Sequence, residues 1–381
     1  MGIGTQSGSR ADRPTSYDLA AFAPVTGAEE EWRFTPVDRL RLLFDTAPTS
    51  AGVAVTVEIP PGGAGASVAV ERVSRSDPRL GKTMPPSDRA AAAAWAGFDE
   101  AIVVSVAEGA IVRGSIRVGV RGKAGAAASA AHILLVAAPN SKATVLLDYT
   151  GSANLTETVE IHVGEGAALR VLSIYEWDLS TVHAASHRAK LAKDAALTHA
   201  AAALGGGVVR LTPDVEFAGP GGTAELLGLY LTDTGQHHEA RLFVDHGAPH
   251  CTSRVTYKGA LHGAGAHTVW VGDVLIRKNA QGTDTYEQNR NLVLVRGARA
   301  DSVPNLEIET GEIVGAGHAS ATGRFDDEQL FYLRSRGIDA ATARRLVVHG
   351  FFAALIGQFG VPEVEERLIA SVDRRLEASL T

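Results

Sequence analysis

Short apolar runs recur from about residue 101 to about residue 325, and turn-forming residues separate them. Representative runs read AIVVSV, HILLVA, LRVLSIY and VVRLTPDVEF, with Glu-Gly-Ala or Gly-Pro-Gly-Gly between such runs. Runs of this length bounded by Gly, Pro and Asn predict β-strands. No convincing amphipathic helix interrupts them, which argues against a parallel α/β sheet. The pattern leaves a sandwich, a barrel, a propeller or a β-solenoid.

The corners between the predicted strands favour the solenoid. They are rich in small residues, as expected where each coil packs only on its neighbours. We find no strict repeat length, so periodicity alone does not single out this fold. The alanine-rich segment 186–203 also suits a helix by composition, but we expect strands there. The region is therefore predicted to be one continuous β-solenoid, with helices only at its two ends.

A mixed region precedes the predicted solenoid. Residues 36–44 and 86–98 predict short helices, the second with Ser87 as its N-cap. Residues 52–60 and 66–73 predict strands on either side of a Pro-Pro-Gly-Gly turn.

Three amphipathic helices are predicted at the C-terminal side. The first spans 327–336, with Asp326 as N-cap and Gly337 as its stop. The second begins after Asp339 and the third near Pro362. We expect these helices to cap the end of the solenoid and to leave one face for a partner.

The pattern divides the chain into three parts. They are an N-terminal mixed region with a disordered tail (1–99), a β-helix core (100–325) and a C-terminal helical domain (326–381). The chain has 381 residues, of which 45% are hydrophobic and 21% charged, so it supports a sizeable core without disulfides.

Charge and cysteine content narrow the function classes. The net charge of -7 argues against a nonspecific nucleic-acid partner. No run of about 18 apolar residues predicts a membrane span, and the polar N-terminal residues lack a secretory signal. The single cysteine, Cys251, excludes an internal disulfide framework and a self-contained four-cysteine cluster site, and fits a reducing cytoplasm.

His318 is the strongest single candidate for a functional residue, because its neighbours in the sequence are the small residues Gly, Ala and Ser. Imidazole is a good ligand for iron, and small neighbours let a cluster or a partner come close. The alternative is that His318 caps a coil. We find no phosphate-binding loop, nucleophile elbow or HExxH motif in the sequence.

Cys251 is the other metal candidate, together with His246 and His250 in VDHGAPHCTSR. In an extended strand the adjacent His250 and Cys251 would point to opposite faces, so we prefer a structural role. We interpret the remaining strand histidines as isolated structural or surface residues: His237, His238, His262 and His267.

A polar run interrupts the apolar texture before residue 292. Its members are Gln281, Thr283, Asp284, Tyr286, Gln288, Asn289 and Asn291. We expect hydrogen-bonded ladders of stacked polar side chains rather than a substrate site.

Several long motifs resemble one known family. They are EEEWRFTPVDRLRLL, SRVTYKGAL, AQGTDTYEQNRNL, NLVLVRGARADSVPNLEIE and GHASATGRFDDEQLFYLRSRGI, in this order. Together they are similar to the SufB/SufD family of iron-sulfur cluster assembly proteins, and more to SufD than to SufB. The resemblance runs from about Glu29 to about Gly350. It implies a right-handed parallel β-helix flanked by N-terminal and C-terminal helical regions.

The resemblance also implies a function. The chain would be a non-catalytic scaffold subunit that pairs with a SufB-like scaffold protein and binds a SufC-like ABC ATPase, and it would form a homodimer in isolation. An iron-sulfur cluster would lie transiently at the partner interface, with no cofactor held stably by this chain alone. The complex is linked with FAD, although the sequence shows no flavin motif.

Family members carry a Cys-x-His at the place of His318, where this chain reads Ala316-Gly317-His318. The resemblance therefore implies that His318 contributes nitrogen while the partner supplies sulfur.

The helical patterns suggest where an ATPase would dock. Apolar stripes with an arginine-rich edge suit the docking of a helix in a groove. The expected contact residues are Phe331, Arg334, Arg336, Arg344, Arg345 and His349.

Two other functions stay open on the residues alone. A β-solenoid fold also suits a carbohydrate-active enzyme, although we find no convincing cluster of acidic and basic catalytic residues. A stand-alone homodimeric metal-binding protein is the other alternative.

Overall fold

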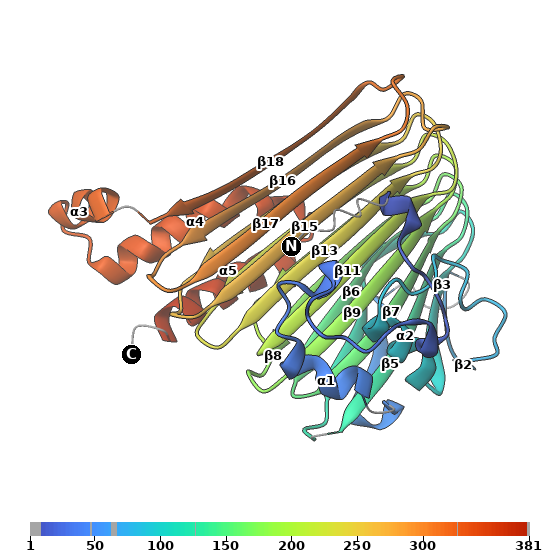
Figure 1. Ribbon diagram of the computed structural model, residues 1–381, viewed down its shortest axis with the longest axis horizontal. Helices are drawn as coiled ribbons and strands as arrows, with labels where there is room; N and C mark the ends of the chain where they lie inside the picture. Colours follow the sequence, from blue (N-terminus) through green and yellow to red (C-terminus); the bar gives the residue numbers. More distant parts are fainter. Residues whose placement is uncertain (1–8, 46–47, 62–66, 126, 326, 379–381) are drawn as a thin grey trace, which may run out of the picture.

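The computed structural model describes residues 9–45, 48–61, 67–125, 127–325 and 327–378. Two nine-stranded sheets face each other along most of the chain (Figure 1). The first sheet contains, in spatial order, β1 (Val53–Glu58), β4 (Ile111–Gly122), β6 (Lys142–Gly151), β8 (Ala168–Trp177), β10 (Ala196–Ala203), β12 (Thr223–Thr232), β14 (Thr252–Leu261), β16 (Asp284–Val293) and β18 (Gly315–Arg324). The second contains β17 (Arg299–Ile308), β15 (His267–Ile276), β13 (His237–His246), β11 (Val208–Phe217), β9 (Val182–Leu191), β7 (Asn154–Val163), β5 (Ala128–Ala137), β3 (Glu100–Val106) and β2 (Val68–Ser74).

The chain alternates between the two sheets, and from β3 onward each strand pairs in parallel with the strand two places later. This is the predicted parallel β-solenoid, and it is confirmed. Val208 pairs with Val182, which lies 26 positions earlier, whereas Asp284 pairs with Thr252, which lies 32 positions earlier. Coils of unequal length explain why the sequence shows no strict repeat.

The alanine-rich segment 186–203 is strand, as predicted, and contributes to β9 and β10. Ala201 packs into the core between the two sheets, whereas Ala200 and Ala202 face the opposite side and are fully buried there. Packing on both faces therefore overrides the helix propensity of alanine.

The outer face of the first sheet is covered by α4 (Ala340–Gln358) and α5 (Pro362–Ala378). Phe352 of α4 and Phe359, which directly follows α4, pack with α5 on Leu172 and Leu229 of the sheet. Arg367 of α5 donates to Asp148 at 2.8 Å and 2.9 Å and also to Glu176, two acceptors on neighbouring strands. A bidentate arginine fixes both position and orientation, so α5 is held in one register on the sheet.

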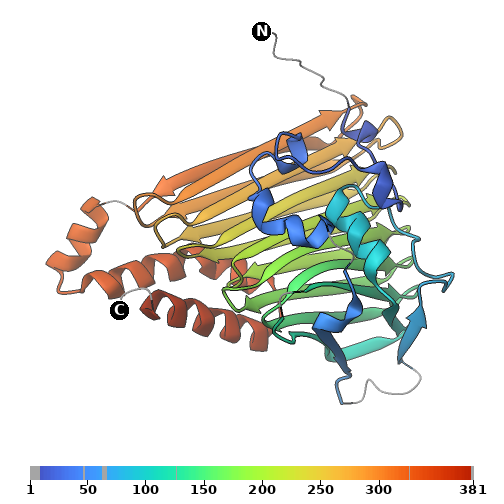
Figure 2. The same ribbon diagram turned by 60° about the horizontal axis from the view of Figure 1, so that its bottom comes forward.

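The three C-terminal helices begin close to the predicted residues, and α3 also ends close to its predicted end, but their predicted position as a cap is wrong. In Figures 1 and 2, α4 and α5 run along the side of the solenoid, and α3 (Asp327–Ser335) extends beyond the strands. The reason is the apolar outer face of the first sheet, which has to be buried. Gly337 ends α3 as predicted, with a φ of 84°, whereas the predicted N-cap Asp326 lies outside the described residues.

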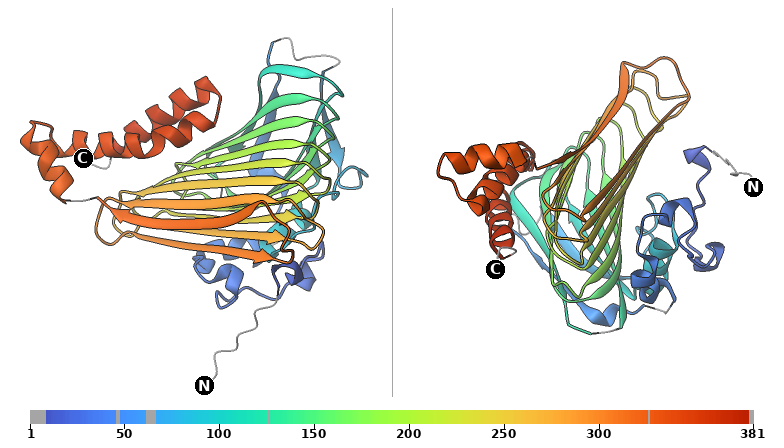
Figure 3. Two further views of the ribbon diagram at one scale, coloured as in Figure 1. Left: turned by 90° about the horizontal axis from the view of Figure 1, so that it is seen from above. Right: turned by 60° about the vertical axis from the view of Figure 1, so that its left-hand side comes forward.

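The outer face of the second sheet is covered by α1 (Val37–Asp45) and α2 (Arg89–Gly97), on the opposite side of the solenoid from α4 and α5 (Figure 3). The short helices η1 (Arg10–Asp12), η2 (Leu19–Ala21), η3 (Glu30–Trp32) and η4 (Ser50–Gly52) belong to the same region. The N-cap of α2 is Asp88 and not the predicted Ser87, because the Asp88 carboxylate accepts from Ala91 N at 2.8 Å. The same carboxylate accepts from the buried Arg210 guanidinium at 2.6 Å.

The two ends of the solenoid differ. At the N-terminal end, β1 and β2 pair antiparallel with β4 and β3, and these short strands carry Glu58, Glu71 and Arg72. Short, charged edge strands discourage further strand pairing. At the C-terminal end, β17 and β18 are the last strands of their sheets, and β18 is largely exposed. This second end is open.

Buried histidines should make the fold sensitive to acid. Burial lowers the pKa of His199 to about 4 and that of His246 to about 3. As the pH falls below about 6.5, these histidines become protonated in the unfolded chain but stay neutral in the folded protein. The free energy of unfolding should therefore fall with pH, by up to about 1.4 kcal/mol per pH unit for each such histidine.

Urea unfolding of His246→Gln at pH 7.5 and pH 5 measures this effect. The loss of stability between the two pH values should be smaller than in the wild type by roughly 2 kcal/mol. His250→Asn is the control, since His250 is exposed at a φ of 60°, which asparagine tolerates. Equal losses in the wild type and His246→Gln would contradict the expectation.

Candidate functional site

His318 lies on β18, at the open end of the solenoid. Ala316 packs against the core between the sheets, and the Ser320 hydroxyl lies 2.8 Å from that of Ser302 on β17. Because alternate residues of a strand share a face, His318 also faces the interior. It is still 44% exposed, since no further coil covers it. His318 therefore lies at the mouth of the solenoid rather than on its outer wall.

Glu287 lies next to His318, one coil deeper, and sequence reasoning missed it. The two residues are partners in the parallel ladder between β16 and β18. Oε1 of Glu287 is 3.9 Å from Nδ1 of His318. The Glu287 side chain is only 1% exposed, and within the described residues neither carboxylate oxygen has a hydrogen-bond partner. Burial, with a contribution from the Asp273 carboxylate, raises the pKa of Glu287 to about 8.

One signal in the sequence marked this position. Alternate residues of β16 are buried, namely Thr285, Glu287, Asn289 and Asn291. A period of two over DTYEQNRNLV thus places Glu287 on the buried face, together with residues that we assigned to a polar ladder.

That polar ladder is real for its two asparagines. Asn289 donates to Tyr230 OH at 2.8 Å, and Asn291 donates to the Asn289 side-chain oxygen at 2.7 Å. The Tyr230 hydroxyl donates in turn to Asn291 at 3.1 Å. Gln281 lies in a turn and Tyr286 is exposed, so the run as a whole is not one ladder.

Cys251 is buried, and its thiol lies 3.5 Å from the carbonyl oxygens of Gly219 and Pro249. Burial raises the pKa of this thiol, which disfavours the thiolate form that binds metals. His246 points to the Ser253 hydroxyl at 2.9 Å, and His250 occupies a turn. Across the part of the chain that the structure describes, no group of three or more His, Cys, Asp or Glu residues is arranged to hold a metal ion.

Two histidines that we expected to be isolated are coupled. The Nδ1 atoms of His237 and His267 lie 3.1 Å apart on neighbouring strands. His237 Nε2 lies 2.9 Å from Glu239, and His267 Nε2 lies 2.7 Å from Asp301. Glu239 also accepts from Arg210 at 3.3 Å, so this network joins the second sheet to the residue that anchors α2.

The predicted docking face divides into exposed apolar and paired charged parts. Phe331 is 74% exposed, and Leu346, which was not among the predicted contact residues, is 51% exposed. In contrast, Arg345 donates to Glu377 at 2.9 Å, and His349 lies 2.6 Å from Asp373, both across to α5. Of the remaining predicted contact residues, Arg334 and Arg336 are exposed, and Arg344 is half-buried. Phe331 and Leu346 are therefore the stronger docking candidates.

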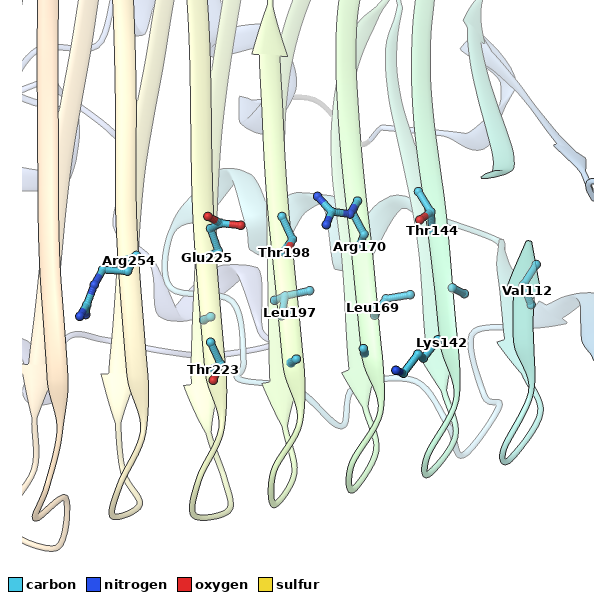
Figure 4. Close-up of a pocket in the computed structure, with 14 residues that line it drawn as sticks. Val112, Lys142, Thr144, Leu169, Arg170, Leu197, Thr198, Thr223, Glu225 and Arg254 are labelled. Atoms are coloured by element: carbon cyan, nitrogen blue, oxygen red, sulfur yellow. The ribbon is translucent and has the colours of Figure 1, made fainter. Parts of the chain in front are cut away.

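A shallow groove of about 560 Å³ crosses the first sheet near its turns (Figure 4). Its charged side chains are Lys142, Arg170, Glu225 and Arg254, on four different strands. Arg170 is already occupied, because it donates to the Phe359 carbonyl at 2.7 Å. The charges do not converge on one point, so the groove has no catalytic arrangement.

Comparison with known proteins connects the chain with one biological process. Residues 120–351 match the family described as SUF system FeS cluster assembly, SufBD core domain. An iron-sulfur cluster assembly SufBD family protein of Mycobacterium tuberculosis is 52% identical over 369 residues, which cover 95% of this chain and 92% of the relative. The cluster assembly protein SufD of Escherichia coli is 29% identical over 216 residues, 57% of this chain and 51% of that protein. SufD of Bacillus subtilis is 34% identical over 112 residues, 29% of this chain and 25% of its own length.

Glu287, His318, Phe331 and Leu346 all lie within the matched residues. No helix in the described part of the chain is long and apolar enough to cross a membrane.

The raised pKa of Glu287 predicts how its replacement by glutamine changes stability. From about pH 4.5 to pH 8 the folded protein keeps a proton on Glu287 that the unfolded chain releases. The stability contributed by this carboxyl therefore falls as the pH rises through that window. Glu287→Gln lacks this loss, so its advantage over the wild type should grow by up to about 1.4 kcal/mol per pH unit and level off above pH 8.

Unfolding midpoints between pH 5 and pH 9 measure the difference. Glu312→Gln, at an exposed position, is the matched control and should follow the wild type. A Glu287→Gln profile parallel to that of the wild type would show that the carboxyl is not protonated in the folded state.

Proposed function

This chain belongs to the SufB/SufD family of iron-sulfur cluster assembly proteins, and from that premise we propose that it is a SufD-like, non-catalytic scaffold subunit. In this proposal it pairs with a SufB-like scaffold protein through the open end of its solenoid, and it binds a SufC-like ABC ATPase through α3 and α4. Without these partners it pairs with a second copy of itself. The iron-sulfur cluster is the cargo that is built at the shared interface.

The observation that carries the proposal is the open end itself. The free edges of β17 and β18 present backbone N–H and C=O groups that another chain can pair with. β18 reads GAGHASATGR, so small side chains let a partner approach the backbone closely. His318 stands at the mouth of this surface and is accessible from it.

The partner is proposed to supply sulfur. Ala316 stands where the resembling family members carry a cysteine, so no thiol of this chain accompanies His318. The only cysteine of the sequence, Cys251, is buried away from the open end on the turn before β14. A complete cluster site therefore needs thiolates from the other side of the interface.

The docking of an ATPase is proposed at the exposed apolar side chains of α3 and α4. Exposed aromatic residues on a projecting helix are typical of partner contacts, because they bury a large apolar area on binding. Phe331 and Tyr332 of α3 and Leu346 of α4 form this surface.

Movement of α4 would reach the open end through the first sheet. Lys258 on β14 donates to the Phe351 carbonyl of α4 at 2.6 Å. β14 pairs with β16, and β16 pairs with β18. ATP-driven movement of the docked ATPase would thus pull on α4 and change the interface where the cluster is built.

Replacement of His318 tests the cluster site. His318→Ala should leave the unfolding midpoint and ATPase binding close to wild type, because the side chain is partly exposed and its contact with Glu287, at 3.9 Å, is too long for a hydrogen bond. It should lower the rate of cluster assembly by the complete complex by about tenfold or more, as expected for loss of a ligand. Assembly is measured by absorbance after anaerobic reconstitution with ferrous iron and sulfide.

A matched variant separates a ligand from a structural cap. Ala316→Cys places a thiol two residues from His318 on the same face and should increase the retention of iron by the complex. If His318→Ala lowers the unfolding midpoint while assembly per folded complex stays unchanged, His318 is a structural residue and the proposed site is wrong.

Replacement of Phe331 tests the docking surface. Phe331→Asp should raise the Kd for the ATPase at least about tenfold, because a charge would replace an apolar anchor. Calorimetry of the purified pair measures it. Leu179→Asp is the control, since Leu179 is 61% exposed but lies on a turn of the solenoid. Charge reversal of Arg345 is less informative, because Arg345 also pairs with Glu377. Equal affinities of Phe331→Asp and the wild type would remove α3 from the interface.

A further inference from the structure

Glu287 is a buried carboxyl for which the described residues provide no side-chain hydrogen-bond partner. Its side chain is 99% buried, and among the described residues no side chain donates a hydrogen bond to either oxygen; the backbone N–H of Asn305 lowers the pKa of the carboxyl by less than burial raises it. Buried polar groups in native proteins are nearly always paired, because an unpaired one costs the free energy of its lost hydration. The unpaired Glu287 carboxyl, close to the proposed partner interface, therefore indicates a binding site for a ligand.

The surroundings of Glu287 leave room for the carboxyl and favour a cation. A side chain on Gly272 of the opposite sheet would overlap the Glu287 carboxyl, so glycine keeps this space free. The neighbouring Asp273 adds negative charge, and its own carboxylate accepts from Asn305 at 2.7 Å. Two acidic residues are thus close together with no lysine or arginine bonded to Glu287 among the described residues.

The distance between Glu287 and His318 suits a shared metal ion. Their nearest atoms, Oε1 and Nδ1, are 3.9 Å apart, which is too long for a hydrogen bond. Oxygen and nitrogen ligands lie about 2.0 to 2.2 Å from a divalent transition metal, so two ligands of one ion are at most about 4.3 Å apart. The separation of the two atoms therefore falls within the range that one ion can bridge.

The chemical nature of the two donor atoms indicates which metal ion this site would bind. Because the pKa of Glu287 is raised to about 8, the ion has to displace the carboxyl proton into solvent when it binds near neutral pH. The resulting carboxylate oxygen and an imidazole nitrogen suit ferrous iron, which such sets bind in non-haem iron sites. Soft ions and clusters prefer thiolate, and at Ala316 this chain offers only a methyl group. Because His318 is 44% exposed, the remaining coordination positions face the open end, where water or a partner can fill them.

We propose that Glu287 and His318 together bind a single ferrous ion at the mouth of the solenoid. The role of this ion in cluster assembly rests on the function proposed above, whereas its binding is a property of this chain alone. His318 is the outer ligand and Glu287 the inner one. The site receives iron before sulfur arrives, and a partner that docks on β18 meets an ion already in place.

Metal binding to the full-length purified chain tests this proposal without any partner. Anaerobic calorimetric titration with ferrous iron should show one ion per chain. Glu287→Gln and His318→Ala should each weaken binding at least about tenfold, since each removes a direct ligand. His250→Asn, which alters an exposed histidine of a distant turn, should bind iron like the wild type. Thermal melts of each variant show that it is folded.

Cobalt(II) gives a second readout that a merely structural role would not change. Its visible absorption should shift in Glu287→Gln, and Ala316→Cys should add a sulfur-to-cobalt charge-transfer band, because the new thiol would lie on the same face as His318. Unchanged iron affinity in folded Glu287→Gln would overturn the proposal.

The outcomes also separate this inference from the proposed function. If the chain fails to bind ferrous iron but His318→Ala still impairs assembly by the complex, the scaffold function stands and the iron site is wrong. If iron binding depends on both residues but assembly does not, the iron site stands and its proposed role in the scaffold is wrong.

Discussion

The hydrogen bonding of the backbone between coils is the constraint on which this structure depends. Each strand of a parallel solenoid satisfies its N–H and C=O groups only through the coils before and after it. The first coil meets this requirement with the antiparallel strands β1 and β2. Among the described residues no such strand follows the last coil, so β17 and β18 form the edges of their sheets there. The surface that we assign to a partner is the direct result of where the coils stop.

The sides of the solenoid are closed by helices, and a few buried charged groups fix them there. Arg210 joins α2 to the second sheet through Asp88 and Glu239, and its guanidinium lies 4.1 Å above the Trp32 ring. Arg367 joins α5 to the first sheet. Such pairs are specific rather than strongly stabilising, because desolvation offsets much of their attraction. These pairs determine where the helices lie on the sheets, while apolar packing supplies most of the stability.

The positions of most strands and helices could be predicted from the sequence, because the spacing of apolar residues within each segment indicates its secondary structure. Short apolar runs predicted the strands, and amphipathic periods predicted α4 and α5 to within a few residues. The misplaced N-cap was one residue away, since Ser87 and Asp88 are both good caps and only the contact with Ala91 distinguishes them. The place of the C-terminal helices was wrong because nothing local shows which sheet face lacks a cover.

Contacts between coils were the part that sequence reasoning could not reach. His237 meets His267 and Glu287 meets His318 only because the coils between them have particular lengths, 30 and 31 residues. These lengths vary along the chain, so no fixed offset reveals such pairs. The family resemblance drew attention to His318 but not to Glu287. The position of Glu287 beside His318 becomes apparent only when β16 and β18 are aligned.

The difference between the two ends also limits the size of any assembly. Two solenoids that meet through β17 and β18 use both free edges, and the short charged strands β1 and β2 then point outward at each end. Growth stops at two chains, whereas a solenoid open at both ends would stack without limit into a fibre. In the proposed pairing, a shortened chain that lacks β1 and β2 would lose this termination, so we expect the N-terminal strands to limit further assembly as well as to complete the fold.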